Sequence, residues 1–306
     1  MSEPLPQEDA LRKIRLKDEY EFGAGYAARW PFYDFSESGI KFHPEAIDHL
    51  ELEGHETILD IGCGWAGVLK SIRGLGHSGL MVGIDYIEDL PLSTPGELEI
   101  FRADASLAMD ASNGLVLNHL PFRDDAFDRV CALFMLYHVE DPRITIEDAI
   151  RILKPMGSMA VATSGAGNKP QHRRHETMIA AALGADMPVR YSNTFTTTEA
   201  EVLLPQLFNQ VERRIQQNSE VVMTKDQWVN TIKGLNGALE AYIFSQQSMS
   251  KNYRILDDTE TKWESSDLVE PIETVVLPDI RRQMEEHGAF VETIERSLYI
   301  CSDPKL

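Results

Sequence analysis

The chain has 306 residues, of which 43% are hydrophobic and 25% are charged, a composition typical of a globular protein with a substantial core. Its 49 acidic residues outnumber 29 basic ones and give a formal net charge of −20, which argues against a nucleic-acid partner because phosphate binding needs clustered Lys and Arg. The N-terminal segment has no apolar signal region and no apolar run is long enough to span a membrane, so we expect a cytoplasmic protein without a membrane partner.

Strands and helices alternate along residues 56–165, which predicts an α/β fold with a mostly parallel sheet covered by helices. In chain order, we expect strands over residues 56–61, 80–85, 97–104, 127–136 and 158–164. A helix over 65–75 follows the first strand, with apolar side chains at helical spacing. An amphipathic helix with Pro142 at its start follows the fourth strand, and "KPMG" at 154–157 is predicted as the turn that ends it.

Three helices are predicted after the fifth strand. The first includes "HETMIAAALG" and ends at Gly184. The second starts with a capping box, in which Thr196 is followed three residues later by Glu199. The third starts with a similar pair, Thr224 and Gln227.

Two more strands complete the predicted sheet, one near 209–222 and a last one over 290–302 after the turn residue Gly288. No internal repeat or low-complexity linker divides the chain. We therefore predict a single domain over residues 1–306.

Cysteine and histidine spacing indicates neither a disulfide nor a metal centre. Cys63, Cys131 and Cys301 are an odd number of cysteines and lie far apart in the sequence. His172 and His175 could hold a metal ion or an acidic group, but no third ligand can be identified. We predict that they belong to the solvated start of a helix and that the protein has no metal site.

The stretch "ILDIGCGWAG" at residues 58–67 combines a buried strand with the glycine spacing G-x-G-x-x-G. Dinucleotide-binding loops share this spacing, with the pyrophosphate at the helix N-terminus. Asp60 distinguishes this loop, because its carboxylate would repel a pyrophosphate but attract a cationic ligand. S-adenosylmethionine has no phosphate and carries an ammonium and a sulfonium. Asp85, 18 residues after Gly67, fits the ribose of either cofactor.

Five ordered motifs resemble those of class I S-adenosylmethionine-dependent methyltransferases, specifically the ubiquinone/menaquinone-biosynthesis-like small-molecule branch. The motifs are "LDIGCGWAG", "VGID" at 82–85, "RADA" at 102–105, "LPFRDDAFDRV" with "LFMLYHVEDP", and "RILKPMG". The resemblance implies a Rossmann-like seven-stranded sheet of order 3-2-1-4-5-7-6 with the last strand antiparallel. It also implies a helical N-terminal lid over 1–50, a cofactor-binding core over 56–165, and substrate-side helices and C-terminal strands over 166–302.

The resemblance further implies which residues bind S-adenosylmethionine or its product S-adenosylhomocysteine. They are Asp60, Gly62, Cys63, Gly64, Asp85, Tyr86, Asp104 and Ala105. Asp85 is expected on the ribose hydroxyls, Tyr86 against the adenine, and Asp104 on the adenine amino group. Asp60 is expected to face the methionine amino group, although it could instead order the loop by accepting backbone N–H bonds. Ala66 stands where the family has a third glycine.

Tyr137 and His138 follow the fourth strand, where many relatives have a His-His pair near the methyl group. Methyl transfer is an in-line displacement, so most of the rate can come from placing the acceptor against the methyl group. We predict that His138 acts as a general base and that Tyr137 orients the acceptor, with helix packing as the structural alternative for His138.

The predicted function is S-adenosylmethionine-dependent methyl transfer to the oxygen, nitrogen or carbon atom of a small molecule. Two alternatives are an NAD-dependent oxidoreductase and a methyltransferase-like protein that binds the cofactor without catalysis. We expect the acceptor pocket to be built by residues 20–39, the loop after the fifth strand and the helical stretch 223–250.

Overall fold

The computed structural model describes residues 42–87, 98–106, 119–184, 194–224 and 269–305. The chain divides into two compact units. The larger unit comprises residues 40–166, 191–217 and 296–306, and the smaller unit comprises 1–39, 167–190 and 218–295. Residues 1–41 of the expected lid, which include the pocket segment 20–39, and residues 225–250 of the expected acceptor pocket lie outside the described residues.

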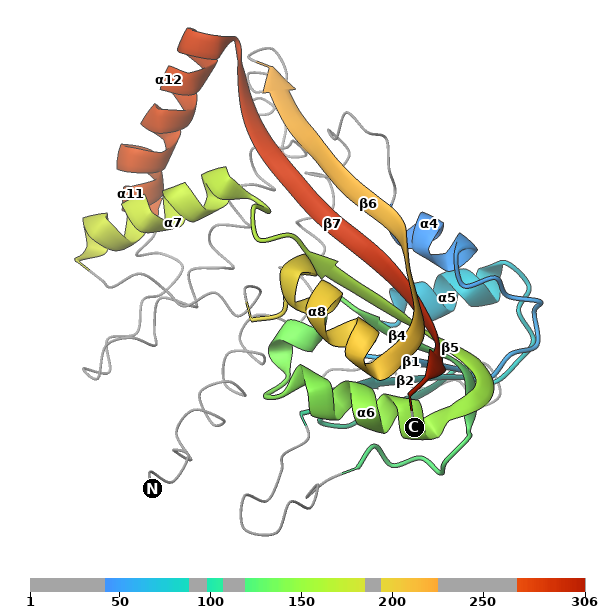
Figure 1. The fold of residues 1–306 in the computed structure, drawn as a ribbon. Coiled ribbons are helices and arrows are strands. Elements are labelled where there is room, and N and C mark those ends of the chain that lie inside the picture. Colours follow the sequence, from blue (N-terminus) through green and yellow to red (C-terminus); the bar gives the residue numbers. More distant parts are fainter. Residues whose placement is uncertain (1–41, 88–97, 107–118, 185–193, 225–268, 306) are drawn as a thin grey trace, which may run out of the picture. The chain divides into compact units, whose positions relative to one another are not determined.

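The strands among the described residues form one sheet of seven in the order β3-β2-β1-β4-β5-β7-β6 (Figure 1). Their bounds are β1 Ile58–Ile61, β2 Met81–Asp85, β3 Glu99–Arg102, β4 Phe127–Leu133, β5 Leu153–Ser164, β6 Phe208–Thr224 and β7 Ala289–Pro304. β1 pairs in parallel with β2 and β4, β2 with β3, and β4 with β5, whereas β7 runs antiparallel to β5. The predicted fold class, strand order and antiparallel last strand are therefore confirmed.

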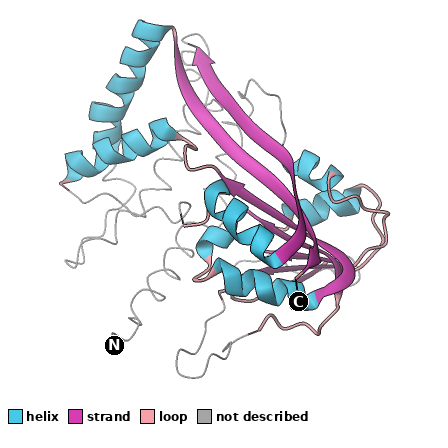
Figure 2. Ribbon diagram, in the orientation of Figure 1, coloured by secondary structure: helices cyan, strands magenta, loops and turns pink. Residues whose placement is uncertain are grey.

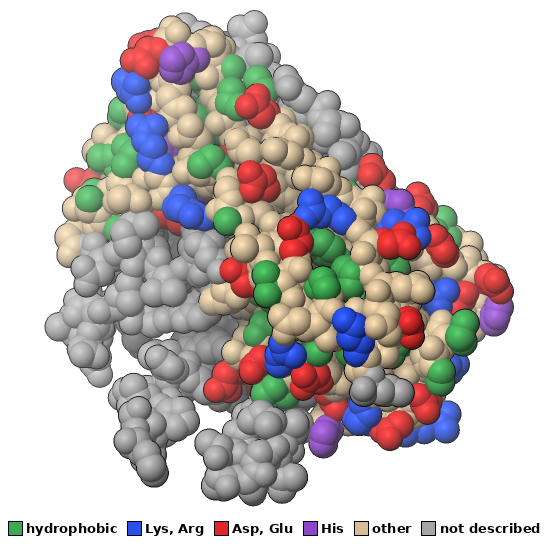
Figure 3. All heavy atoms as spheres, viewed as in Figure 1, with side chains coloured by type: hydrophobic (Ala, Val, Ile, Leu, Met, Phe, Trp, Pro, Cys, Tyr) green, Lys and Arg blue, Asp and Glu red, His purple; other side chains and the backbone are tan. Residues whose placement is uncertain are grey.

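Helices cover both faces of the sheet within the larger unit (Figures 1 and 2). Their bounds are α4 Phe42–Asp48, α5 Gly67–Gly74, α6 Pro142–Ile152 and α8 Thr197–Leu207. α4 and α5 pack into one buried apolar cluster with Ile58 of β1, and α6 and α8 pack into another with Leu59. Neighbouring strand residues point to opposite faces, so a strand that is buried on both faces has the continuous apolar sequence seen here. Acidic and basic side chains are interspersed over α6 and α8 on the face seen in Figure 3.

β4 is shorter than the predicted strand over 127–136. It ends at Leu133 because Phe134 has a left-handed backbone with φ of 57°, which breaks the strand geometry. Residues Leu136–His138 then form the 3₁₀ turn η1. The sequence alone did not show this break because the apolar run continues through it.

β5 is longer than the predicted strand over 158–164, since it begins at Leu153 immediately after α6. The "KPMG" segment is therefore part of a strand and not a turn. The register explains how it fits: Phe127 pairs with Leu153 but Arg129 pairs with Ser158, so the added residues bulge from the ladder.

Both helix signals that fall on described residues after the fifth strand are confirmed. The Thr196 amide donates to Oε2 of Glu199 at 2.8 Å, and the Thr198 amide donates to the Thr196 hydroxyl oxygen at 3.2 Å, which completes the capping box of α8. The helix α7 (Pro170–Leu183) ends at Gly184, whose φ of 65° is favourable for glycine.

The smaller unit contains α7, the helices α11 (Val269–Pro271) and α12 (Leu277–His287), and the π-helical turn η5 (Ile272–Val276). His172 and His175 of α7 have no exposed surface, so the prediction of a solvated helix start is wrong. Nδ1 of His172 lies 3.1 Å from Oε2 of Glu292, and Nε2 of His175 lies 3.0 Å from Oδ2 of Asp279. The carboxylate partner of each buried histidine comes from a distant segment of the chain.

The described residues contain neither a disulfide nor a cluster of metal-ligand side chains. No described helix is long and apolar enough to cross a membrane.

Candidate functional site

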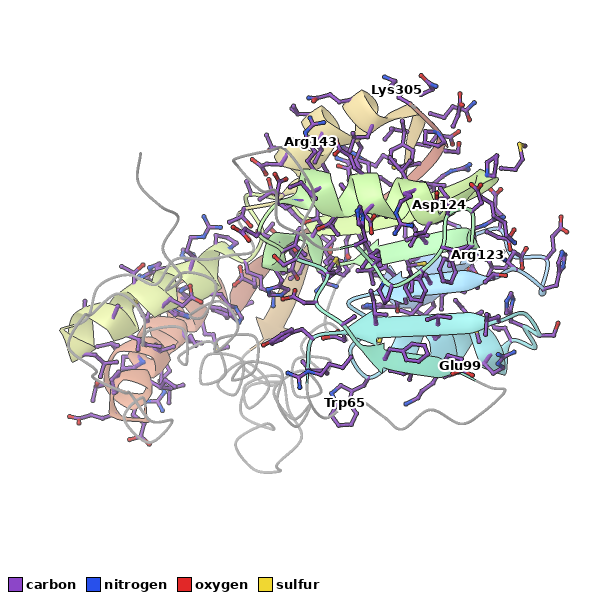
Figure 4. All side chains as sticks on the ribbon, turned by 90° about the horizontal axis from the view of Figure 1, so that it is seen from below. Trp65, Glu99, Arg123, Asp124, Arg143 and Lys305 are labelled. Carbon is purple, nitrogen blue, oxygen red and sulfur yellow. The ribbon has the colours of Figure 1, made fainter. Side chains whose placement is uncertain are left out.

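The glycine loop after β1 is held against β2 and against the segment that follows β4. The backbone amides of Gly62 and Cys63 both donate to the carbonyl oxygen of Ile84, at 2.8 and 3.0 Å. A Cβ on Gly62 would lie 2.6 Å from the Cβ of Met135, so only glycine permits this approach. Figure 4 shows Trp65 of this loop at the end of the sheet opposite to Glu99, the first residue of β3. The loop thus lies at the carboxyl ends of the strands, where open α/β sheets bind ligands.

Asp85, at the end of β2, orders the loop. Its Oδ2 accepts the Gly64 amide at 2.7 Å and its Oδ1 accepts the Ile87 amide at 3.1 Å. Burial raises the pKa of this carboxyl group, although the three backbone hydrogen bonds from Gly64, Ile87 and Tyr86 oppose the shift. A carboxylate has about four acceptor sites, so Asp85 can also accept bonds from ligand hydroxyls.

Asp60 lies in β1, paired with Gly83 of β2 and Cys131 of β4, and only 3% of its surface is exposed. Burial, followed by the negative charge of Asp85, raises the pKa of Asp60 to about 8. No described residue donates a hydrogen bond to its carboxylate, so the loop-ordering role that the sequence allowed for Asp60 belongs to Asp85. A cationic group near Asp60 would offset both causes of the shift.

Cys63 is a packing residue. Its side chain is buried, and its Sγ would lie 2.7 Å from a Cβ on Gly83, so the thiol fills the space that glycine leaves in β2. Burial and the charges of Asp60 and Asp85 raise the pKa of this thiol, which keeps it neutral and unreactive.

The remaining predicted cofactor residues follow β2 and β3. The guanidinium Cζ of Arg102 lies 5.4 Å from the centroid of the Tyr86 ring, and its Nε donates to the Tyr86 carbonyl oxygen at 3.2 Å. Oδ1 of Asp104 accepts the Ser106 amide at 2.9 Å, and the carbonyl oxygen of Ala105 accepts the Thr145 hydroxyl at 2.9 Å. These bonds fix the start of the loop after β3 at the carboxyl edge.

Tyr137 and His138 lie together in η1, beyond the carboxyl end of β4. Their ring centroids are 4.5 Å apart in an edge-on arrangement, and both side chains are half-buried. The His138 amide donates to the Met135 carbonyl oxygen at 2.8 Å, and the Tyr137 carbonyl oxygen accepts the Thr194 hydroxyl at 3.2 Å. The backbone of this turn is therefore tied at two points.

The structure brings the predicted residues to one edge of the sheet, from the ends of β1, β2, β3 and β4. Sequence reasoning missed Met135, which meets Gly62 and so joins the glycine loop to η1. Its signal was weak, because a methionine within the apolar run "LFMLYH" is indistinguishable from an ordinary core residue.

The loop fits S-adenosylmethionine better than a dinucleotide. Two buried or half-buried carboxyl groups with raised pKa suit a ligand that presents cationic groups and hydroxyls. A pyrophosphate would add negative charge next to Asp60, whose pKa is already raised by burial and by the charge of Asp85.

Comparisons with known proteins agree. A family model described as a methyltransferase domain matches residues 59–161. The chain is 30% identical over 160 residues to the mitochondrial ubiquinone biosynthesis O-methyltransferase of Dictyostelium discoideum, covering 48% of this chain and 46% of that protein. It is also 30% identical over 161 residues to the ubiquinone biosynthesis O-methyltransferase of Maricaulis maris, covering 48% and 61%. The chain spans about half the length of the curated relatives it matches.

A solved structure from Anabaena variabilis, provisionally assigned as a methyltransferase of an antibiotic biosynthesis pathway, has the same fold. It aligns with a TM-score of 0.52 at 14% identity, over 87% of this chain and 97% of that one. The strand order and the glycine loop agree with this match: residues 59–161 are similar to a methyltransferase domain.

Proposed function

We propose that this protein transfers the methyl group of S-adenosylmethionine to a small-molecule acceptor. The buried carboxyl group of Asp60 in the glycine loop carries the proposal, because a cation is the ligand that relieves its raised pKa. The similarity to two proteins named ubiquinone biosynthesis O-methyltransferases supports a small acceptor.

The cofactor would supply an electrophilic methyl group, and the chain's own residues would hold it. Asp85, which holds the Gly64 amide, would also accept the ribose hydroxyls, and Asp60 would face the methionine ammonium. Gly62 would let the backbone come close to the ligand, and Tyr86 and Asp104 would bind the adenine. Cys63 and Ala105 contribute backbone only.

At the acceptor, His138 takes the proton of an attacking hydroxyl or amine, and Tyr137 orients the acceptor beside it. Their edge-on packing and the two backbone hydrogen bonds of η1 support this assignment, since a base must be held in a fixed position. For an acceptor that loses no proton, placing the acceptor atom against the methyl group would by itself account for the rate of transfer.

Isothermal titration with S-adenosylhomocysteine and with NAD tests the cofactor assignment. We expect S-adenosylhomocysteine to bind and NAD to show no binding, and Asp85→Ala to weaken S-adenosylhomocysteine by about 1–3 kcal/mol because hydroxyls lose a buried partner. Tighter binding of NAD would favour the oxidoreductase alternative.

A second measurement separates an enzyme from a protein that binds the cofactor without catalysis. Radiolabelled S-adenosylmethionine is incubated with the protein and small-molecule extracts, and transferred label is counted. Binding of S-adenosylhomocysteine without any labelled product would favour the non-catalytic alternative.

A further inference from the structure

Three rings and one guanidinium gather beyond the carboxyl end of β4, all within the larger unit. Phe42 and His43 of α4 have ring centroids 5.0 and 6.0 Å from that of Phe134. The guanidinium Cζ of Arg296, on β7, lies 5.5 Å from the same Phe134 centroid. We call these four residues the Arg296 cluster.

The strand register places the cluster next to the proposed cofactor loop. Arg296 pairs with Ser164, the last residue of β5, so it lies at the carboxyl edge of the parallel strands. Phe134 directly precedes Met135, which packs against Gly62. The cluster is therefore adjacent in the chain to both the glycine loop contact and η1.

Phe134 is held in an unusual conformation. Its φ of 57° is left-handed, which is rare for a bulky side chain, and its amide donates to the Ala162 carbonyl oxygen at 2.9 Å. Such strain persists only where the surroundings fix it, and it collects at ligand sites. Here it turns the chain out of β4 and leaves the ring between α4 and Arg296.

The cation of the cluster is Arg296 and not His43. Burial, and then the positive charge of Arg296, lower the pKa of His43 to about 4, so the imidazole is neutral at physiological pH. Arg296 is itself only half-buried. A planar guanidinium over an aromatic ring is suited to a carboxylate attached to a flat molecule, because its donors form a fork that matches two oxygens.

We propose that Arg296 binds a carboxylate of the methyl acceptor while Phe134 packs against the acceptor's apolar or aromatic body. The acceptor class is then a small organic acid. This inference rests on the proposed function and narrows it, since Phe134 belongs to the same segment after β4 as Tyr137 and His138.

The carboxylate could come from two sources, the acceptor or the methionine part of the cofactor, and titration separates them. The full chain and Arg296→Gln are titrated with S-adenosylhomocysteine. We expect affinities within about twofold of one another, because the proposal assigns Arg296 to the acceptor. A loss of about tenfold or more in Arg296→Gln would assign the carboxylate to the cofactor and overturn the proposal.

The second arm uses hydroxylated benzoates and cinnamates together with their primary amides. Binding of each pair to the protein saturated with S-adenosylhomocysteine is followed by ligand-observed NMR, and methyl transfer by label counting. We expect acids to bind at least about tenfold tighter than their amides, a preference that Arg296→Gln loses and Arg296→Lys keeps in part.

Arg213→Gln is the matched control. The Cζ of Arg213 lies 5.5 Å from the Tyr299 ring centroid, the same distance as that of Arg296 from Phe134. Tyr299, however, pairs with Val161, which is farther from the carboxyl end of β5 than Ser164 is. We expect it to keep the preference for acids. Equal binding of acids and amides to the wild-type protein, or equal loss in both variants, would overturn the inference. The proposed function would stand in that case if amides were methylated, and it would fail if S-adenosylhomocysteine did not bind.

Discussion

Asp60 lies one residue before the end of β1, and Asp85 ends the neighbouring parallel strand β2. The charge of Asp85 is the second cause, after burial, of the raised pKa of Asp60. The two carboxyl groups interact differently with the glycine loop. Asp85 accepts the Gly64 amide, whereas Asp60 is left without a described donor.

Asp60→Asn should remove a pH dependence of stability. A carboxyl group whose pKa rises from 3.8 to about 8 on folding stabilises the fold fully below pH 4, and this contribution is lost as pH rises towards 8. The free energy of unfolding should change by at most about 1.4 kcal/mol per pH unit. Urea unfolding between pH 5 and 8 should show it in the wild-type protein and not in the variant. Asp128→Asn is the control, because Lys154 lowers the pKa of Asp128 and its contribution is lost only as pH falls.

Binding of S-adenosylhomocysteine near pH 7 should release a proton from Asp60. The ligand ammonium favours the ionised carboxylate, so the pKa of Asp60, about 8 without ligand, falls on binding. Calorimetry in buffers with different ionisation enthalpies measures the number of protons released on binding. Asp60→Asn should bind without this release; an unchanged release would place the titrating group elsewhere.

Gly62→Ala should destabilise the protein by about 1–3 kcal/mol, the usual cost of overpacking. Its φ is 72° and its Cβ would meet the Cβ of Met135 at 2.6 Å. Gly64→Ala is the matched control, since its φ of 51° carries a similar backbone cost but no atom lies within 4 Å of the added Cβ. Thermal and urea unfolding of both variants measure the difference, and equal losses would show that Met135 does not restrict the loop.

His138→Ala should lower turnover by about 10²–10⁴-fold and leave the affinity for S-adenosylhomocysteine unchanged. The reason is that the general base acts on the acceptor and not on the cofactor. Initial rates and calorimetry check both parts, with His287→Ala, which alters an exposed histidine at the end of α12, as the control. A loss below about threefold would leave His138 as a packing residue and positioning as the source of the rate.

His172→Ala should destabilise the smaller unit by about 1–3 kcal/mol, because the buried Glu292 carboxyl group loses the imidazole but keeps the backbone amides of Gln171 and His172. Glu292 has no exposed surface, and burial raises its pKa to about 7, so its stabilising contribution is lost as pH rises through 7. Hydrogen exchange of α7 measures the local change. A chelator should not alter the wild-type protein; a lower melting temperature with chelator would instead reveal a bound metal.

The sequence determined the parts of this protein that depend on neighbours along the chain. The strand "ILDI" and the glycines after it, the capping box of Thr196 and Glu199, and Gly184 at the end of α7 are set by local spacing and backbone preference. The order of the motifs fixed the strand order through the family resemblance. These features could be read without knowing what packs against them.

Tertiary structure decided which side chains are buried and which of them meet. Glu292 lies 120 residues after His172, and Arg296 lies far along the chain from Phe134. No local sequence pattern therefore predicts either contact. The sequence did not show that β4 ends before Phe134 for the same reason, since the contacts of this residue come from α4, β5 and β7. Burial and pairing depend on partners from distant segments, and only the folded chain brings those partners together.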